Sequence, residues 1–366
     1  MNILGPHNDA QIVLFGGSRI LGGVEVFNRR LIGLVEGEGA KVHAARLNSH
    51  LGVRNRLLAG LNFLRSSMLS LVYLWVRRPP TVVVSAANIL DVLAAWAFAR
   101  FTRRHDIILI AHFNASWAFW KKTWLLRLFQ GASRRLRVFC VAPNQRAYFV
   151  SCGIRVDEAI FPNFINYRVG STQVPIASNE ERGRLLKALF VGRVVPEKRV
   201  DALAAFLARV ADAAMPIELG IVGTCMGKHE KEILRQQTSD FRIVFHGPKS
   251  ETDVSLALQD AMLFCSFSSS DTLPLNMLEA ADHNLPILTI RNPVTEDIRD
   301  LVGEVLFVEE REPAQAVRDK IYATLSARKR DLSLDFVAKN NSLACDILGI
   351  EKNRIITSVR NNGSAS

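Results

Sequence analysis

Short β-rich runs alternate with segments of helical length along almost the whole chain. In the first half, these runs are residues 11–15, 41–46, 81–85, 106–111 and 137–142. In the second half, they are residues 188–191, 218–222, 242–245, 262–267, 285–290 and 304–308. Such an alternation is typical of parallel sheets that carry helices on both faces. The sequence therefore predicts an α/β protein of the doubly wound type.

The length predicts two domains of this kind. The chain has 366 residues, which exceeds the size at which a single hydrophobic core usually stops growing. Residues 161–166, and the polar stretch that follows them to Arg184, carry turn-forming residues in place of a strand or helix pattern. We therefore expect an N-terminal domain over residues 1–165, a C-terminal domain over residues 166–345, and a C-terminal segment with a disordered tail over residues 346–366.

The sequence favours a cytoplasmic protein. The longest apolar run near the N-terminus, residues 66–76, has eleven residues, whereas about 20 are needed to cross a bilayer. The first ten residues include Pro6 and Asp9, where the apolar core of a signal peptide would lie. The five cysteines are scattered without a C-x-x-C pair, which argues against a zinc site and a disulfide framework.

Charge is distributed unevenly along the chain. Residues 1–170 hold 22 Lys and Arg against 8 Asp and Glu, so the remaining residues hold 24 against 27. All five tryptophans lie in this basic half. Basic charge together with tryptophan is typical of proteins that bind an anionic membrane surface. Nucleic acid attracts the same charge, but no known nucleic-acid-binding motif accompanies it.

Two common functions of doubly wound domains lack their motifs. A dinucleotide site needs G-x-G-x-x-G directly after the first strand and an acidic residue at the end of the second. The glycines in residues 16–23 have a different spacing, and the second predicted strand ends in Arg46, Leu47 and Asn48. Neither a Walker A motif nor an H-E-x-x-H motif occurs. These absences argue against hydride transfer and P-loop chemistry.

Residues 268–280 combine features of an anion-binding helix start. They follow a predicted buried strand, and Pro274 suits a first helical turn, with Asp271 or Thr272 as its cap. The backbone N–H groups of Leu275 and Asn276 would then be free to bind a diphosphate.

The two acidic residues of this segment suit the rest of a nucleotide sugar. Glu279 lies further along the same predicted helix, where its carboxylate can accept hydrogen bonds from both hydroxyls of a ribose. Asp271 lies at the mouth of the helix and would face the sugar. The segment thus predicts a nucleotide-sugar site.

The same segment resembles the family-4 glycosyltransferases. Their mark is E-x7-E, and Asp271 and Glu279 match it with Asp in place of the first Glu. Ala280 and Pro286 match the E-A-x-x-x-G-x-P that follows, while Asn284 replaces the glycine. Asn tolerates a left-handed backbone better than most residues, so the turn can be kept. The resemblance implies the GT-B fold, with two Rossmann-like domains facing across a cleft, and a retaining hexosyltransferase activity.

A second segment resembles the phosphate-binding element of this family. Residues 190–199 match a strand followed by G-R-x-x-x-x-K-G/R. The resemblance implies that Arg193 and Lys198 hold the donor phosphates, where two fixed cations stabilise the negative charge that develops on the leaving diphosphate. A metal ion is then unnecessary, and we expect no metal and no cofactor besides the GDP- or UDP-linked sugar.

The N-terminal half matches the family more loosely. Residues 22–25 match G-G-x-E, in which Gly23 would approach a donor phosphate, while Glu25 is either a site residue or a helix cap. His112 ends a predicted strand and resembles the active-site histidine that contacts the transferred sugar, although a structural histidine is the alternative. Residues 162–163 resemble the P-N of the domain junction. Gly223, after a strand of the second half, matches a further glycine position.

A stripe of tryptophans at helical spacing suggests where a membrane would be contacted. The proposed surface consists of Trp117, Trp120, Lys121, Lys122, Trp124 and Arg127. The alternative is a helix that faces the core. The basic and apolar stretch from Arg54 to Arg78 supports the same face as a membrane surface.

The sequence therefore predicts a retaining glycosyltransferase that transfers a mannose- or glucose-type hexose. The acceptor would be a polyprenyl-linked glycan of exopolysaccharide or lipopolysaccharide synthesis at the inner face of the membrane. A nucleotide-sugar epimerase of GT-B fold and a catalytically silent, membrane-associated assembly partner are the alternatives. The donor base, acceptor and oligomeric state are left open by the sequence.

Overall fold

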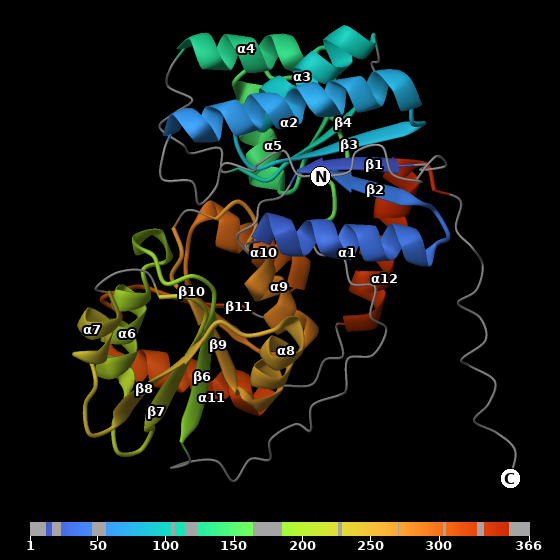
Figure 1. The fold of residues 1–366 in the computed structure, drawn as a ribbon. Coiled ribbons are helices and arrows are strands. Elements are labelled where there is room, and N and C mark those ends of the chain that lie inside the picture. The colour runs from blue at the N-terminus through green and yellow to red at the C-terminus, as the bar shows by residue number, and fades with distance from the viewer. Residues whose placement is uncertain are drawn as a thin grey trace, which may run out of the picture. The chain divides into compact units, whose positions relative to one another are not determined.

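The structure is a computed structural model of the chain. It describes residues 12–16, 23–45, 56–103, 107–113, 123–163, 185–225, 229–269, 271–302, 305–327 and 333–350. Contacts divide the chain into two compact units (Figure 1). Unit 1 comprises Met1–Arg168 and Val337–Ser366, and unit 2 comprises Val169–Phe336. We describe each unit separately.

Unit 1 is built on a five-stranded parallel sheet in the order β2-β1-β3-β4-β5. Its strands are β1 (Ile12–Gly16), β2 (Val42–Ala45), β3 (Thr81–Ala86), β4 (Ile108–Ala111) and β5 (Arg137–Cys140). Every residue of β1 and β4 is buried. Strands covered on both faces are uniformly apolar, which explains runs such as Ile-Val-Leu-Phe and Ile-Leu-Ile-Ala.

Helices cover both faces of this sheet. They are α1 (Gly23–Gly37), α2 (Arg56–Arg77), α3 (Ile89–Thr102), α4 (Thr123–Ser133) and α5 (Pro143–Ser151). The chain steps from β1 to β2 in one direction and from β2 through β5 in the other, so right-handed crossovers place α1 on one face and α2, α3 and α4 on the opposite face. Figure 1 shows this arrangement, and α3 contacts both α2 and α4.

Unit 2 has a six-stranded parallel sheet in the order β11-β10-β9-β6-β7-β8. Its strands are β6 (Leu186–Val191), β7 (Ile217–Val222), β8 (Phe241–Gly247), β9 (Leu263–Ser266), β10 (Ile287–Ile290) and β11 (Val305–Val308). The chain runs from β6 outward to β8 and then returns to the other side of β6 as β9. This is the strand order of a Rossmann domain.

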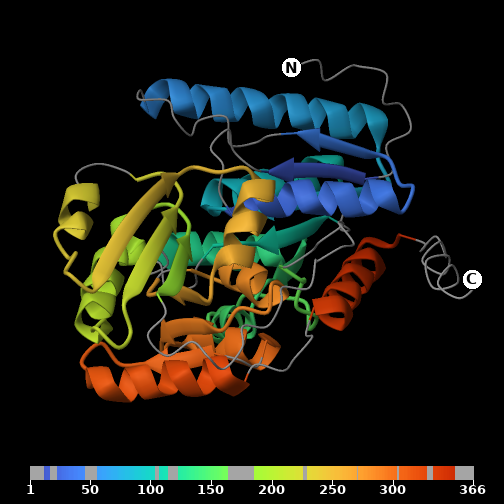
Figure 2. The same cartoon turned by 90° about the horizontal axis from the view of Figure 1, so that it is seen from below.

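The helices of unit 2 follow from the same crossover rule. They are η2 (Pro196–Lys198), α6 (Val200–Val210), α7 (His229–Leu234), α8 (Glu251–Asp260), α9 (Leu275–Asp282), α10 (Pro293–Val302) and α11 (Ala314–Ala327). α6 contacts α7 and α11 on one face, and α9 contacts α10 on the other. Figure 2 shows α6 and α11 on the same side of the strands.

All eleven predicted strands are confirmed, with ends that shift by at most two residues. The predicted boundary followed Ile165 and kept residues up to Cys345 in the C-terminal domain, whereas contacts divide the chain after Arg168 and group Val337–Ser366 with unit 1. A helix, α12 (Ser333–Leu348), spans that second division. No helix in the described part of the chain is long and apolar enough to cross a membrane.

Candidate active site

The carboxyl ends of β6 and β9 define the candidate donor site of unit 2. The two strands are neighbours, with Ala188 opposite Leu263 and Leu189 opposite Phe264. Beyond them the chain continues in opposite directions, because β6 leads to β7 on one side and β9 leads to β10 on the other. Ligands of open α/β sheets bind at such a switch point. The segments predicted to hold the donor follow these two strands.

Two glycines permit the loops after β6 and β7 to pack closely. Gly192 has a φ of +150° and Gly223 a φ of +141°. A Cβ atom on Gly223 would lie 1.9 Å from the carbonyl oxygen of Gly192. Only glycine fits this position, which explains the glycine that the sequence singled out at residue 223. The loop that carries Arg193 and Lys198 is thereby held against the end of β7.

Lys198 and Asp271 form an ion pair that links the two loops. The Lys198 Nζ donates to both carboxylate oxygens of Asp271, at 2.5 and 2.6 Å. Their side chains are only 16% and 21% exposed, so the pair is shielded from bulk solvent. The backbone N–H of Ser269 also donates to the carbonyl of Glu197 at 3.3 Å. The predicted phosphate-binding lysine and the predicted sugar-facing carboxylate are therefore direct neighbours.

The start of α9 differs from the predicted one in its cap. Pro274 is the N-cap residue, without a side-chain capping bond, and the helix begins at Leu275. The prediction of Asp271 or Thr272 as the cap is therefore wrong, because the two residues lie three and two positions too early. Asp271 is engaged by Lys198 instead.

The helix start nevertheless presents free donors. Within the described part of the chain, the backbone N–H groups of Leu275 and Asn276 donate no hydrogen bond to another residue. The Asn276 side chain donates through Nδ2 to the carbonyl of Val191 at 2.6 Å, which fixes the start of α9 to the end of β6. Two N–H groups at a fixed helix start are suited to bind an anion.

The remaining predicted residues of unit 2 lie on the same elements. Glu279 is half-buried in α9, and Arg193 is exposed directly after Gly192. Asn284 has a φ of +55°, so the left-handed turn predicted for it is confirmed. Sequence reasoning missed Ser268, whose hydroxyl is buried and has no hydrogen-bond partner among the described residues. Buried hydroxyl groups normally have a partner, so this one is free to bind a ligand or water.

In unit 1, His112 follows the end of β4 at the carboxyl edge of the sheet. Its backbone N–H donates to the carbonyl of Ala86 at 2.8 Å, which keeps it beside the end of β3. Its Nε2 lies 3.4 Å from the hydroxyl of Ser85. The ring packs edge-on against Phe27 of α1, with 4.5 Å between ring centroids. The ring is therefore held by residues from two other elements, β3 and α1.

The surroundings of His112 keep the imidazole neutral. Burial lowers the pKa of His112 to about 3, although a hydrogen bond with Asn163 acts in the opposite direction. Part of the residue is still accessible to solvent. A neutral imidazole has one donor and one acceptor nitrogen, so it orients hydroxyl groups without adding positive charge. His112 is suited to contact a sugar rather than a phosphate.

Two partners of this histidine, Ser85 and Phe27, were not predicted. Ser85 is fully buried and donates to the Asn28 side-chain oxygen at 2.6 Å. A Cβ atom on Gly16 would lie 2.5 Å from the Ser85 carbonyl oxygen, so the end of β1 packs tightly there. The available signal was the serine itself, which is a polar residue at the carboxyl end of an otherwise apolar strand.

The structure describes some of the other residues that were predicted for unit 1. Gly23 begins α1 and is exposed, and Glu25 lies in the first turn, 3.8 Å from Arg29. In the predicted membrane surface, Trp124 and Arg127 are exposed on α4. Trp117, Trp120, Lys121 and Lys122 lie outside the described residues.

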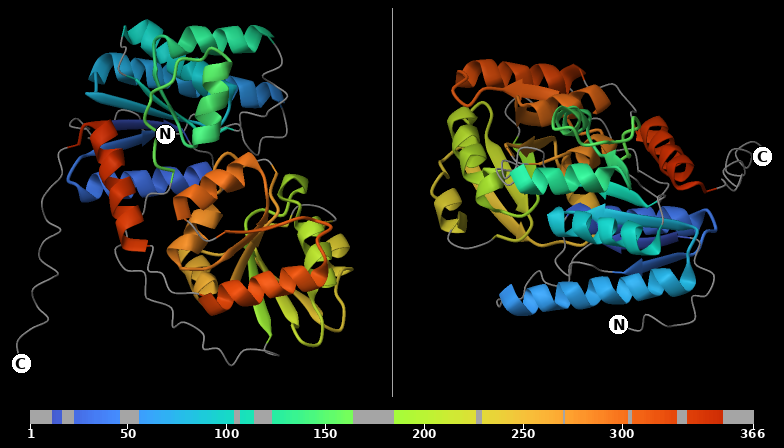
Figure 3. Two further views of the ribbon diagram at one scale, coloured as in Figure 1. Left: turned by 180° about the vertical axis from the view of Figure 1, so that it is seen from behind. Right: turned by 90° about the horizontal axis from the view of Figure 1, so that it is seen from above.

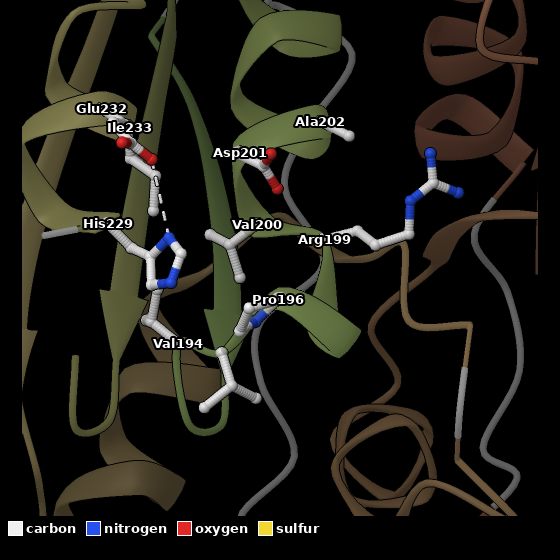
Figure 4. A pocket seen from close by; sticks show the side chains of 10 residues that line it. Val194, Pro196, Arg199, Val200, Asp201, Ala202, His229, Glu232 and Ile233 are labelled. Atoms are coloured by element: carbon white, nitrogen blue, oxygen red, sulfur yellow. Dashed lines mark ion pairs between the residues drawn. The ribbon is translucent and has the colours of Figure 1, made fainter. Parts of the chain in front are cut away.

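A cavity of about 290 Å³ opens beside the donor site of unit 2 (Figure 4). It is lined by Val194, Val195, Pro196, Arg199, Val200, Asp201, Ala202, His229, Glu232 and Ile233. Figure 4 shows His229 paired with Glu232, whose atoms lie 3.6 Å apart. None of the predicted site residues lines this cavity. The candidate site is therefore defined by the groups at the carboxyl ends of β6 and β9, and this cavity is not part of it.

Within the described ranges, no group of three or more His, Cys, Asp or Glu residues is placed to hold a metal ion.

Comparisons with known proteins agree with this geometry. Residues 186–327 match the family of glycosyl transferases group 1. This match covers almost all the described residues of unit 2, including the ion pair and α9. A search of curated protein sequences gave no significant match.

Solved structures of enzymes share the fold over most of the chain. The apo form of WaaB, a lipopolysaccharide outer core galactosyltransferase, is 16% identical, with a TM-score of 0.60 over 92% of this chain and 96% of that chain. Sucrose-phosphate synthase from Thermosynechococcus elongatus is 13% identical, with a TM-score of 0.65 over 93% and 94%. A putative UDP-N-acetylglucosamine 2-epimerase from Listeria monocytogenes is 12% identical, with a TM-score of 0.56 over 92% and 96%.

The fold defines the class of structure. The chain has the two-domain, Rossmann-like GT-B fold, and its residues 186–327 resemble the glycosyl transferases group 1. The resemblance predicted from the sequence is confirmed at this level.

Proposed function

We propose that the protein is a retaining glycosyltransferase that takes a mannose- or glucose-type hexose from a GDP- or UDP-linked donor. One observation carries this proposal: a cation and two free backbone N–H groups lie where β6 and β9 end, and a carboxylate follows about one turn along α9. They belong to Lys198, to Leu275 and Asn276, and to Glu279. The cation and the N–H groups suit a diphosphate, and the carboxylate suits the hydroxyls of the ribose next to it.

Each group has a role in binding the donor. The N–H groups at the start of α9 bind the diphosphate, with Lys198 and Arg193 as its cationic partners. Glu279 accepts the hydroxyl protons of the ribose, and the buried hydroxyl of Ser268 is a further partner for a polar donor atom. Asp271 is directed to the sugar. Gly23 and Glu25 have the roles that the resemblance gives them, approach to the donor phosphate and contact with the donor.

The reaction is a front-face displacement with retention. The acceptor oxygen forms a bond to the anomeric carbon as the bond from that carbon to the diphosphate oxygen breaks. The acceptor proton passes to the leaving diphosphate, so neither an enzymic nucleophile nor a metal ion is required. Fixed cations stabilise the charge that develops on the diphosphate. The neutral His112 contacts the transferred sugar.

The proposed acceptor is a polyprenyl-linked glycan of exopolysaccharide or lipopolysaccharide synthesis, reached from the inner face of the membrane. The basic, tryptophan-rich first half of the chain supports a membrane-bound acceptor. The similarity to WaaB, which is named as a lipopolysaccharide galactosyltransferase, favours this pathway.

Thermal stabilisation by nucleoside diphosphates tests the donor site. A ligand that binds only the native state raises its melting temperature. We expect GDP or UDP to stabilise the protein, and Glu279→Ala to abolish this effect. Glu296→Ala, which removes an exposed carboxylate paired with Arg291 in α10, is the matched control and should respond as the wild type does. No stabilisation by any nucleoside diphosphate would contradict the proposal and favour a catalytically silent partner.

Product analysis tests the reaction class. The fold of an epimerase is as compatible with the chain as that of a transferase, so the donor is incubated with and without acceptor glycan. A transferase releases nucleoside diphosphate and forms an α-linked product from an α-linked donor only when the acceptor is present. An altered sugar in the mixture without acceptor would assign the epimerase reaction instead.

A further inference from the structure

Exposed apolar side chains are concentrated on one helical layer of unit 1. Seventeen large hydrophobic side chains are exposed in the described part of the chain, and twelve of them lie on α2, α3 and α4. Unit 2 contributes only three, Leu185, Leu256 and Leu301. Apolar patches of this extent are rare on soluble monomers and mark surfaces that bind a partner or a membrane.

α2 carries most of this surface as one continuous stripe. The exposed large apolar side chains are Leu61, Leu64, Met68, Leu69, Val72, Trp75 and Val76. Steps of three and four residues place them on one face of the helix. The opposite face packs into the core through Tyr73 and Leu74, which are 5% and 1% exposed. α2 is therefore apolar on both faces, although only the inner face has a protein partner among the described residues.

The stripe continues onto the two helices beside α2. α3 contacts α2 and exposes Phe101, and α4 contacts α3 and exposes Trp124 and Leu128. Figure 3 (right) shows the three helices side by side as one layer. We call the exposed side chains of α2, α3 and α4 the outer layer. Its aromatic members are 59–66% exposed, apart from Trp96 at 37%.

The outer layer carries only positive charge at its surface. Exposed arginines lie among the apolar side chains on all three helices, as Arg65, Arg100 and Arg127. The single acidic residue of the three helices is Asp91, which is fully buried and caps α3 together with Asn88. A protein partner would need acidic and apolar groups matched to this pattern, whereas an anionic bilayer offers phosphates above hydrocarbon at any position. Arginine and tryptophan are suited to this boundary.

We propose that the outer layer docks the protein onto an anionic phospholipid bilayer, with α2 parallel to the membrane surface. The 22 residues of α2 would extend its contact over about 33 Å. This inference deepens the proposed function, because it names the surface through which a lipid-linked acceptor is approached. In this proposal the principal membrane contact is α2 in place of the predicted tryptophan stripe. Trp124 and Arg127 of that stripe lie at the side of the outer layer.

Vesicle sedimentation of the full chain tests this surface. We expect the wild-type protein to bind vesicles of phosphatidylglycerol and phosphatidylcholine, to bind pure phosphatidylcholine less, and to be released by salt. Val72→Glu and Trp75→Glu should each weaken binding about tenfold or more, because each places a carboxylate in the acyl region and removes buried apolar area. Leu256→Glu is the matched control, since Leu256 is as exposed as Val72, at 57% against 54%, but lies on α8. It should bind as the wild type does.

Three further measurements make the outcome decisive. Brominated lipids should quench tryptophan fluorescence in the wild type, and less in Trp75→Phe. Stabilisation by GDP or UDP should be retained in every variant, so loss of vesicle binding is distinguished from misfolding and from failure of the donor site. Wild-type binding by Val72→Glu and Trp75→Glu would overturn the proposal. So would a dimer without lipid that Val72→Glu dissociates, because the layer would then bind a second copy of the chain.

Discussion

Lys198 and Asp271 are 73 positions apart in the chain, yet the lysine nitrogen lies 2.5 Å from a carboxylate oxygen of the aspartate. The pair joins the loop after β6 to the loop after β9, directly before α9. Without a donor, the positive charge of Lys198 is balanced by Asp271. A bound diphosphate would compete with Asp271 for this charge, which would couple donor binding to the position of the carboxylate that we propose to face the sugar.

Lys198→Met should reduce transfer strongly without unfolding the protein. Loss of one fixed group that stabilises transition-state charge typically costs about 10²–10³ in turnover. The measurement is the rate of nucleoside diphosphate release in the presence of acceptor. Lys187→Met is the control, because Lys187 forms a similar but exposed pair with Asp260 at 2.8 Å. Equal turnover in the two variants would show that Lys198 does not stabilise the transition state of transfer.

Asp271→Asn should separate binding from transfer. The substitution frees the charge of Lys198, so the dissociation constant for a nucleoside diphosphate should stay the same or fall. Transfer should decrease by at least about tenfold, because the group that we propose to face the sugar loses its charge. Calorimetric titration and turnover measure the two effects. Weaker nucleotide binding in Asp271→Asn would show that the pair supports the phosphate site instead of competing with it.

Gly223→Ala should destabilise unit 2 far more than Gly247→Ala. Both glycines have positive φ values, +141° and +67°, but only the Cβ atom at residue 223 would meet backbone, at 1.9 Å from the oxygen of Gly192. We expect the free energy of unfolding to fall by about 1–2 kcal/mol for Gly247→Ala and by about 3 kcal/mol or more for Gly223→Ala. Denaturant titration measures both. Similar losses in the free energy of unfolding for the two variants would mean that the loop after β6 can shift at little cost to accommodate the added Cβ atom.

His112 should make stability depend on acid. Its pKa is about 3 in the folded protein, against 6.5 for an ordinary histidine. Between these values the unfolded chain binds the proton more readily, so acid favours unfolding, while above pH 6.5 the residue contributes no pH dependence. From pH 6 to pH 4.5 this residue alone should lower the free energy of unfolding by about 2 kcal/mol. Urea titrations of the wild type and His112→Gln measure the difference, and the variant should lose this part of the slope. Parallel slopes would contradict a neutral His112.

The sheets were predictable because their strands are buried on both faces. Runs such as Ile-Leu-Ile-Ala have few alternatives once they lie between layers of helices. The donor site was predictable where backbone chemistry determines it, as in the free N–H groups of Leu275 and Asn276 and the left-handed turn at Asn284. Contacts between distant segments were not. The partners of Lys198 and His112, and the buried Ser85, depend on which strands become neighbours, and no local pattern contains that information.

The grouping of Val337–Ser366 with unit 1 has a consequence for the order of assembly. A ribosome delivers the chain from its N-terminus, so unit 2, which ends at Phe336, is complete before most of α12 has emerged. Unit 1 begins first but acquires the buried side chains Ala344, Cys345 and Leu348 last. Unit 2, which carries the proposed donor site, can therefore mature during synthesis, whereas the unit that carries the outer layer reaches this set of contacts only after α12 has been made.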